Sequence, residues 1–174
     1  LSIYTVNCIF EAAGLRLWDV EQLSTHGGSL RVFGCHEDDA RATTPAVDAM
    51  LSKETEGGLR SIATYHDFQV RANQIKNDLL SFLIEHKRAG KKVAAYGAAA
   101  KGNTLLNYAG VKPDLLSFVC DAAPSKQGKF MPGSHIPILT PQAMQDHQPD
   151  FVIILPWNLA DEVIKANAFV REWG

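Results

Sequence analysis

The 174-residue sequence predicts an α/β fold whose larger part is built on a parallel β-sheet. From residue 93 onward, short apolar runs alternate with helix-forming stretches, which is typical of parallel strands joined by helical crossovers. The small residues from Gly97 to Gly102 join the first apolar run to the first helix, at the place where such sheets bind anions. The run at 151–155 is almost wholly apolar, as expected for a strand buried on both faces. We therefore predict a Rossmann-like domain.

The first 34 residues predict a small unit of one helix and one hairpin. Apolar side chains recur at helical spacing from Val6 to Ala13, and Gly14 follows as a C-cap. Residues 15–20 and 30–33 read as two strands. A helix and a two-stranded hairpin cannot bury both of their faces alone. We therefore expect this unit to be the edge of another sheet.

Two further segments precede the parallel sheet. Residues 35–58 are polar and predict a linker that contains a short helix from Pro45 to Lys53. Residues 59–88 carry apolar side chains at a spacing of three or four, which predicts a long amphipathic helix. Lys91 and Lys92 follow this helix, near its negative end.

Four strands and three helices are expected in residues 93–174. The strands are predicted at 93–96, 115–120, 136–139 and 151–155. The helices are predicted at 102–108, after Thr140 as N-cap, and after Asn158 as N-cap. The expected strand order is 3-2-1-4. The chain then reverses direction between strands 1 and 4, which opens a crevice at their carboxyl ends. The loops 97–102 and 156–158 should meet there.

Gly97 to Gly102 match G-x-A-x-x-G, a relaxed dinucleotide-binding fingerprint. In this interpretation Gly97 permits the tight turn, Ala99 allows close approach of a ligand, and Gly102 lets the helix pack on the strand. The alternative interpretation is that small residues serve only close helix packing. The motif alone is weak, because alanine replaces the middle glycine.

Two charged residues favour a ligand loop. Lys101 lies inside the turn and suits a point-charge clamp on a phosphate. Asp121 follows the second strand, 19 residues after Gly102, where nucleotide-binding sheets place an acidic residue that bonds a ribose hydroxyl.

Two loops supply further candidate ligand contacts. The loop 125–135 contains glycine and lysine, so Lys126 could reach an anion beside Lys101. A solvated connection is the alternative. Trp157, after the fourth strand, suits stacking on a base or sugar ring, or core packing. Asn158 is a candidate contact as well as an N-cap.

No catalytic or metal-binding set stands out. His26 lies in a turn at 25–29 without a base, nucleophile and orienting group around it. No His, Cys, Asp or Glu cluster has metal-ligand spacing. We therefore expect a binding domain without catalytic residues, without a metal and without a cofactor of its own.

Composition limits the partners. Hydrophobic residues make up 46% and the formal net charge is −2, so we expect no nucleic-acid partner. No apolar run approaches the ~18 residues of a membrane span, and the sequence begins without a signal-peptide pattern. The three cysteines, Cys8, Cys35 and Cys120, form no C-x-x-C pair. They are expected to be buried thiols in a reducing, cytoplasmic compartment.

Ordered matches along nearly the whole chain resemble the C-terminal part of nucleotide-sugar C-methyltransferases. The matching segments are 25–32, 91–93, 96–107, 126–128, 132–138 and 157–162. The resemblance implies that residues 1–34 are the end of an S-adenosylmethionine-dependent methyltransferase domain and that 59–174 form the substrate-binding domain. The S-adenosylmethionine loop, the zinc-binding cysteines and the catalytic base would all precede Leu1. A fragment of this kind is not expected to be active alone.

The implied substrate is a nucleotide-diphosphate sugar with a keto-deoxysugar. Loss of a proton beside the keto group would give an enolate, which would attack the sulfonium methyl. Lys101, the amides from Ala98 to Asn103, and Lys126 would hold the diphosphate. The upstream methyltransferase and zinc-binding domains would be the partners.

Two alternatives from other classes remain at this stage. The first is an NAD-binding domain of an oxidoreductase, which would use Gly97 to Gly102 and Asp121. The second is a non-catalytic interaction domain whose long helix packs on a partner.

Overall fold

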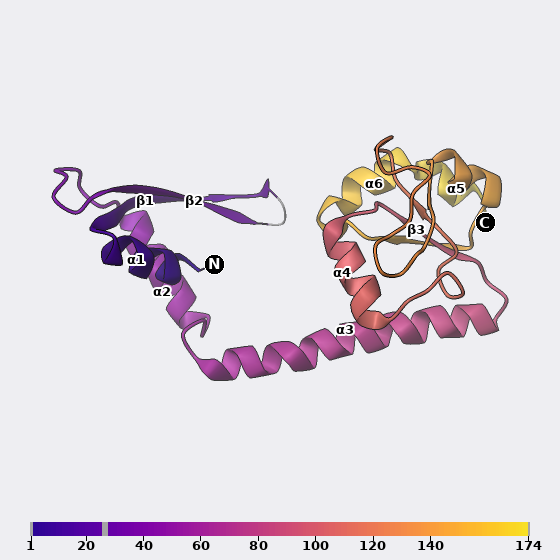
Figure 1. Ribbon diagram of the computed structural model, residues 1–174, viewed down its shortest axis with the longest axis horizontal. Coiled ribbons are helices and arrows are strands. Elements are labelled where there is room, and N and C mark those ends of the chain that lie inside the picture. Colours follow the sequence, from indigo (N-terminus) through magenta and orange to yellow (C-terminus); the bar gives the residue numbers. More distant parts are fainter. Residues whose placement is uncertain (1, 26–27, 174) are drawn as a thin grey trace. The chain divides into compact units, whose positions relative to one another are not determined.

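The computed structural model describes residues 2–25 and 28–173. These residues form two compact units, Leu1–Val70 and Arg71–Gly174 (Figure 1). The long helix α3, Ile62–Arg88, contributes to both units. Each unit has its own hydrophobic core, so each is described separately.

The first unit combines a hairpin with two helices. The antiparallel strands β1, Leu15–Leu23, and β2, Ser29–His36, pair along their length. Helices α1, Ile3–Ala12, and α2, Pro45–Glu56, pack with β1 around a core that includes Ile3 from α1, Leu17 and Val20 from β1, and Val47 from α2. The predicted hairpin is thus present. His26, which we placed in its turn, lies outside the described residues.

Residues 35–58, which we expected to be a linker, include a helix that packs on this unit. The Glu54 side chain is 9% exposed, and its carboxylate accepts hydrogen bonds from the N–H groups of Ile3 and Tyr4 at 2.7 and 3.0 Å. A carboxylate at the first turn of α1 complements the helix dipole. Helix α2 therefore stabilises the start of α1, and it extends three residues beyond the predicted end at Lys53.

The second unit is a parallel sheet covered by helices on both faces. Its strands are β3, Val93–Tyr96; β4, Val119–Cys120; β5, Ile138–Leu139; and β6, Phe151–Ile154. Their spatial order is β5-β4-β3-β6, and all neighbouring pairs are parallel. Numbered one to four along the chain, this is the order 3-2-1-4. The predicted α/β fold class is confirmed.

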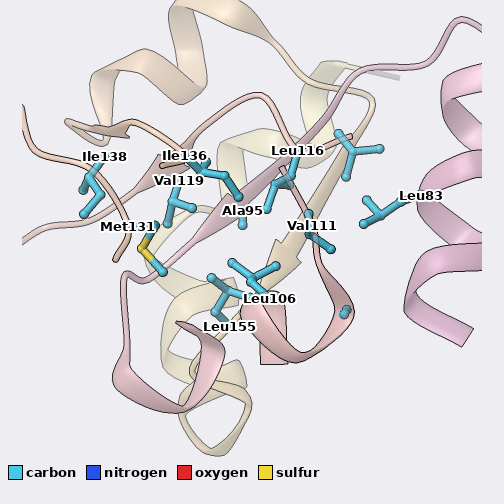
Figure 2. Close-up of a cluster of buried hydrophobic side chains, with 12 residues drawn as sticks. Leu83, Ala95, Leu106, Val111, Leu116, Val119, Met131, Ile136, Ile138 and Leu155 are labelled. Carbon is cyan, nitrogen blue, oxygen red and sulfur yellow. The ribbon is translucent and has the colours of Figure 1, made fainter. Parts of the chain in front are cut away.

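Two hydrophobic clusters pack against this sheet. One joins Leu83 of α3 and Leu106 of α4, Ala100–Ala109, to Ala95 of β3 and Val119 of β4 (Figure 2). The other joins Met144 of α5, Gln142–His147, to Ala94 and Cys120. Neighbouring residues of β3 thus belong to different clusters, as expected when successive side chains point to opposite faces.

Several element boundaries differ from the predictions. The second predicted strand, 115–120, shrinks to Val119–Cys120 because the N–H groups of Leu115 and Leu116 bond to Lys112 O in a turn. The predicted N-cap Thr140 makes no side-chain cap, since α5 begins at Gln142 after Pro141. Asn158 is no N-cap either. It lies in the 3-10 turn η2, Trp157–Leu159, and α6, Ala160–Ala166, begins after it.

The cysteines differ in their exposure. Cys35 and Cys120 are buried free thiols, whereas Cys8 is exposed, contrary to the expectation that all three are buried. Burial raises the pKa of the Cys120 thiol to about 11, so this thiol is protonated at neutral pH.

In residues 2–25 and 28–173, no helix combines the length and the apolar character that a membrane span requires. In the same residues, no three His, Cys, Asp or Glu side chains are grouped as metal ligands would be.

Candidate functional site

The loop between β3 and α4 begins at Gly97, and its conformation requires glycine. Gly97 has a φ of +88°, a region that residues with a Cβ rarely adopt. Its N–H donates to Cys120 O at 2.7 Å, which ties the loop to the end of β4. A Cβ at Gly97 would lie 2.5 Å from Pro156 Cδ. The loops 97–102 and 156–158 therefore meet as predicted, and at Gly97 they are in direct packing contact.

Gly102 has an equally close neighbour. It is buried in the first turn of α4, and a Cβ there would lie 2.6 Å from Leu155 Cβ. The absence of a side chain therefore lets α4 approach the residue that follows β6. Both glycines of the motif serve packing, as the alternative interpretation of this loop proposed.

The start of α4 presents unpaired backbone donors. Ala99 is the N-cap residue and supplies no side-chain cap, and no acidic residue occupies the first turn. Within the described part of the chain, the backbone amides of Ala100, Lys101 and Gly102 donate to no acceptor. Free N–H groups at a helix start attract anions, and the helix dipole adds to this attraction.

Asp121 holds the loop between β3 and α4 by hydrogen bonds to backbone N–H groups. Its side chain is buried at 7% exposure, and it accepts hydrogen bonds from the N–H groups of Ala98 at 2.7 Å and Ala123 at 2.8 Å. Burial opposes ionisation of this carboxylate. The hydrogen bonds from Ala123, Lys126 and Ala98 outweigh burial, so the pKa of Asp121 lies below its ordinary value.

Asp121 thus already serves the fold of this loop. Both of its carboxylate oxygens already accept hydrogen bonds from the protein. The N–H of Ala98 is used by the same contact, so it is not free for a phosphate. This arrangement differs from the ribose-binding role that the sequence spacing predicted, and no sequence signal distinguished the two roles.

Lys126 joins the loop 125–135 to the motif at 97–102. Its Nζ donates to Ala98 O at 3.0 Å and to Asp121 Oδ2 at 3.1 Å. An ammonium group has three donors, so one remains after these two contacts. Gln127 Nε2 donates to Asp121 O at 2.9 Å and fixes the same turn.

Lys101 reaches in the other direction, toward the end of β6. Its ammonium donates to Asn158 Oδ1 and lies 4.9 Å from the centre of the Trp157 ring. Trp157 is 57% exposed, so it is not the core residue of the alternative interpretation. Neither partner carries a charge, so the positive charge of Lys101 remains available to an anion.

A groove of about 760 Å³ opens beside the start of α4. It is lined by residues of the motif, of α4 and of the following loop: Ala98, Ala99, Ala100, Asn103, Thr104, Ser125, Lys126, Lys129, Phe130, Met131, Pro132 and Ile138. Three of the predicted ligand contacts thus line the groove: Ala98, Asn103 and Lys126. A fourth, Lys101, does not line it.

Asn103 lines this groove, and its side chain includes an unusual polar atom. Its Oδ1 is buried and has no hydrogen-bond partner among the described residues. A buried acceptor without a partner is costly unless something supplies a donor. Lys129 and Phe130, which the sequence analysis did not single out, also line the groove. The only sequence signal for them was their place in the loop 125–135.

The arrangement provides binding chemistry. It combines helix-start amides, lysine ammonium groups and exposed aromatic rings. These groups can hold a polar anion with an aromatic part, by charge-assisted hydrogen bonds and stacking.

Comparison with known proteins adds two findings. A family model described as the C-methyltransferase C-terminal domain matches residues 24–174. C-methyltransferase NovU of Streptomyces niveus is 36% identical over 163 residues, which cover 94% of this chain and 39% of NovU. The chain thus spans about two fifths of the length of this relative.

Proposed function

The chain belongs to the C-methyltransferase C-terminal domain family, and from this premise we propose that it binds the acceptor substrate of a methyl transfer. The proposed acceptor is a keto-deoxysugar linked to a nucleoside diphosphate. The proposed methyl donor is S-adenosylmethionine. The resemblance of segments such as 96–107 and 157–162 to nucleotide-sugar C-methyltransferases supports this substrate class.

The single observation that carries the proposal is the start of α4. Three amides that have no acceptor among the described residues lie at one helix end, together with the Lys101 ammonium, whose partners there are uncharged. A diphosphate carries enough negative charge to use both. An NAD-binding site of the ordinary kind fits less well, because Asp121 and the Ala98 N–H bond to each other.

We assign two kinds of role to the candidate residues. The amides of the first α4 turn, Lys101 and the remaining donor of Lys126 contact the diphosphate. Asn103, Trp157 and Asn158 contact the parts of the substrate on either side. Gly97, Gly102, Asp121 and the Ala98 backbone act indirectly, because they hold the loop in shape.

The proposed contribution to the reaction is placement. When bound, S-adenosylmethionine supplies the methyl group, and no residue of this chain is assigned to that molecule. Residues of this chain would hold the sugar carbon in line with the methyl group, which lowers the entropic part of the barrier. The proposed partners are the methyltransferase and zinc-binding domains of the longer protein.

Lys101→Ala tests the proposal in the full-length enzyme. Loss of a charge-assisted hydrogen bond is worth roughly 1.5–3 kcal/mol, so we expect affinity for the nucleotide sugar to fall by about 10- to 150-fold. Affinity for S-adenosylmethionine should stay unchanged. Isothermal titration calorimetry measures both constants.

Lys165→Ala in α6 is the matched control. It removes the same charge from an exposed position outside the groove, and it should change neither affinity. An equal loss for both ligands in Lys101→Ala, or no loss for the nucleotide sugar, would reject the assignment.

A further inference from the structure

Two different surfaces flank the start of α4. On one side lies the groove, with Phe130 at its lining. On the other side lie Lys101, Asn158 and Trp157, which contact one another. A nucleotide sugar also has two different ends, with the diphosphate between the base and the sugar. A diphosphate at the start of α4 would place one end on each surface.

Phe130 is an exposed aromatic ring on a well-supported backbone. It is 62% exposed, whereas its neighbour Met131 is buried. The segment around it is fixed by backbone hydrogen bonds of 2.8 Å, from Ile138 N–H to Lys129 O and from Met131 N–H to Ile136 O. Successive residues of such an extended segment point to opposite sides. The backbone of Phe130 is thus held at the groove before any ligand arrives.

The chemistry of the two surfaces differs. Phe130 has no polar atom, so it offers only a flat apolar face, which suits a nucleobase. On the other surface, Asn158 and Lys101 supply polar groups, and the Trp157 indole combines a ring face with an N–H donor. Such a set suits the hydroxyl groups of a sugar better than it suits a base.

We propose that the nucleobase of the substrate stacks on Phe130 in the groove, with the sugar on the opposite side of α4 against Trp157. In this orientation the ribose lies beside Asn103, which lines the groove. The proposal rests on the proposed function, because the diphosphate at α4 fixes where both ends begin.

The test compares three probes by isothermal titration calorimetry on the full chain at fixed salt. The probes are inorganic pyrophosphate, the tightest of thymidine, uridine, adenosine and guanosine diphosphate, and the glucose conjugate of that same nucleotide. Phe130→Ala should weaken the nucleoside diphosphate by roughly 5- to 150-fold, which is the range for stacking of one base. It should leave pyrophosphate unchanged, and Phe130→Tyr should keep the wild-type affinity.

Trp157→Ala gives the complementary result. It should weaken the nucleotide sugar and leave the nucleoside diphosphate unchanged. Phe68→Ala in α3 is the control, because Phe68 is also an exposed phenylalanine and lies outside the groove. It should change no affinity, and thermal denaturation checks that all variants fold.

The outcomes separate the inference from the proposed function. If the wild type binds neither pyrophosphate nor any nucleoside diphosphate, the proposed diphosphate site is wrong, and the inference falls with it. If both probes bind but Phe130→Ala binds the nucleoside diphosphate as well as the wild type does, only the inference is wrong. Equal loss for pyrophosphate and nucleotide, or loss of nucleoside diphosphate in Trp157→Ala alone, would also overturn it.

Discussion

The two sides of the loop after β3 differ in how closely they are packed. Toward β6, Gly97 meets Pro156 and Gly102 meets Leu155 with no room for a methyl group. Toward the loop 125–132, the same segment borders an open groove. One short motif therefore does two jobs. Its glycines pack closely against the residues that follow β6, and Ala98, Ala99 and Ala100 line the groove.

This difference explains the alanine at the middle position of the motif. Ala99 has a φ of −88° and a ψ of 147°, an extended conformation that any residue adopts. Within the motif, Gly97 alone has a left-handed backbone, and its two glycines, Gly97 and Gly102, each face a side chain at clash distance. The departure from the G-x-G-x-x-G fingerprint thus weakens neither the turn nor the packing.

Gly97→Ala should cause the largest loss of stability, because it disturbs the close packing between the loop 97–102 and Pro156. The left-handed backbone and the contact with Pro156 together should cost about 2–5 kcal/mol of unfolding free energy. Urea denaturation measures this loss. Gly110→Ala is the control, because Gly110 has a similar φ of +68° but open space around it. If the two variants lose equal stability, the contact with Pro156 contributes nothing.

Asp121→Asn should weaken the hydrogen bonds that join the loop 97–102 to the loop that borders the groove. Replacing the carboxylate weakens its hydrogen bonds with Ala98, Ala123 and Lys126, at a cost of about 1.5–3 kcal/mol. The pKa of Asp121 is lowered by folding, so its contribution is present above the ordinary Asp value of about 3.9. It is lost as the pH falls through the lower pKa of the folded state.

Unfolding free energies measured between pH 7 and pH 2 check this pH dependence. Wild type should lose its advantage over Asp121→Asn in the acid range, below about pH 4. Asp150→Asn is the control. The side-chain hydrogen bond from Lys91 and the backbone N–H of Lys92 also lower the pKa of Asp150, but this ion pair is exposed and screened by salt. A difference between wild type and Asp121→Asn that does not change with pH would contradict the role of the charge.

Gly102→Ala should have the smallest effect, because two contributions oppose each other. Alanine stabilises a helix interior by about 1 kcal/mol relative to glycine, whereas overpacking against Leu155 costs about 1–3 kcal/mol. We expect a net loss of about 0–2 kcal/mol. A double-mutant cycle with Leu155→Ala should show coupling between the two positions. A stabilised single variant would mean that α4 moves away from Leu155 at no cost.

The sequence predicted most of the architecture of the second unit because its signals are local. The alternation of apolar runs and helical stretches placed β3, α4 and β6 close to their observed bounds. The shorter strands β4 and β5 were overestimated, since Leu115 and Leu116 are apolar but lie in a turn. Apolar character reports burial, and burial occurs in turns as well as in strands.

The candidate site was predicted less completely. The motif, Lys101 and the residues after β6 were found, and the structure brings Lys101, Trp157 and Asn158 together. Lys129 and Phe130 were missed, because an exposed phenylalanine in a loop has no pattern of its own. The sequence predicts Asn158 as the N-cap of the last helix, with Asp161 in its first turn. The 3-10 turn after Pro156 moved the helix start beyond Asn158.

By itself, the sequence determined the α/β class, the parallel sheet, the long helix and the place of the small-residue turn. These properties follow from hydrophobic periodicity and from backbone preferences, which act over a few neighbouring residues. Only the tertiary structure decided which contacts each polar group makes. Asp121 bonds to Ala98 and Lys126 rather than waiting for a ligand, and Lys101 turns toward Asn158. Hydrogen bonds between distant segments depend on distances of a few tenths of an ångström, and such distances exist only once the chain has packed.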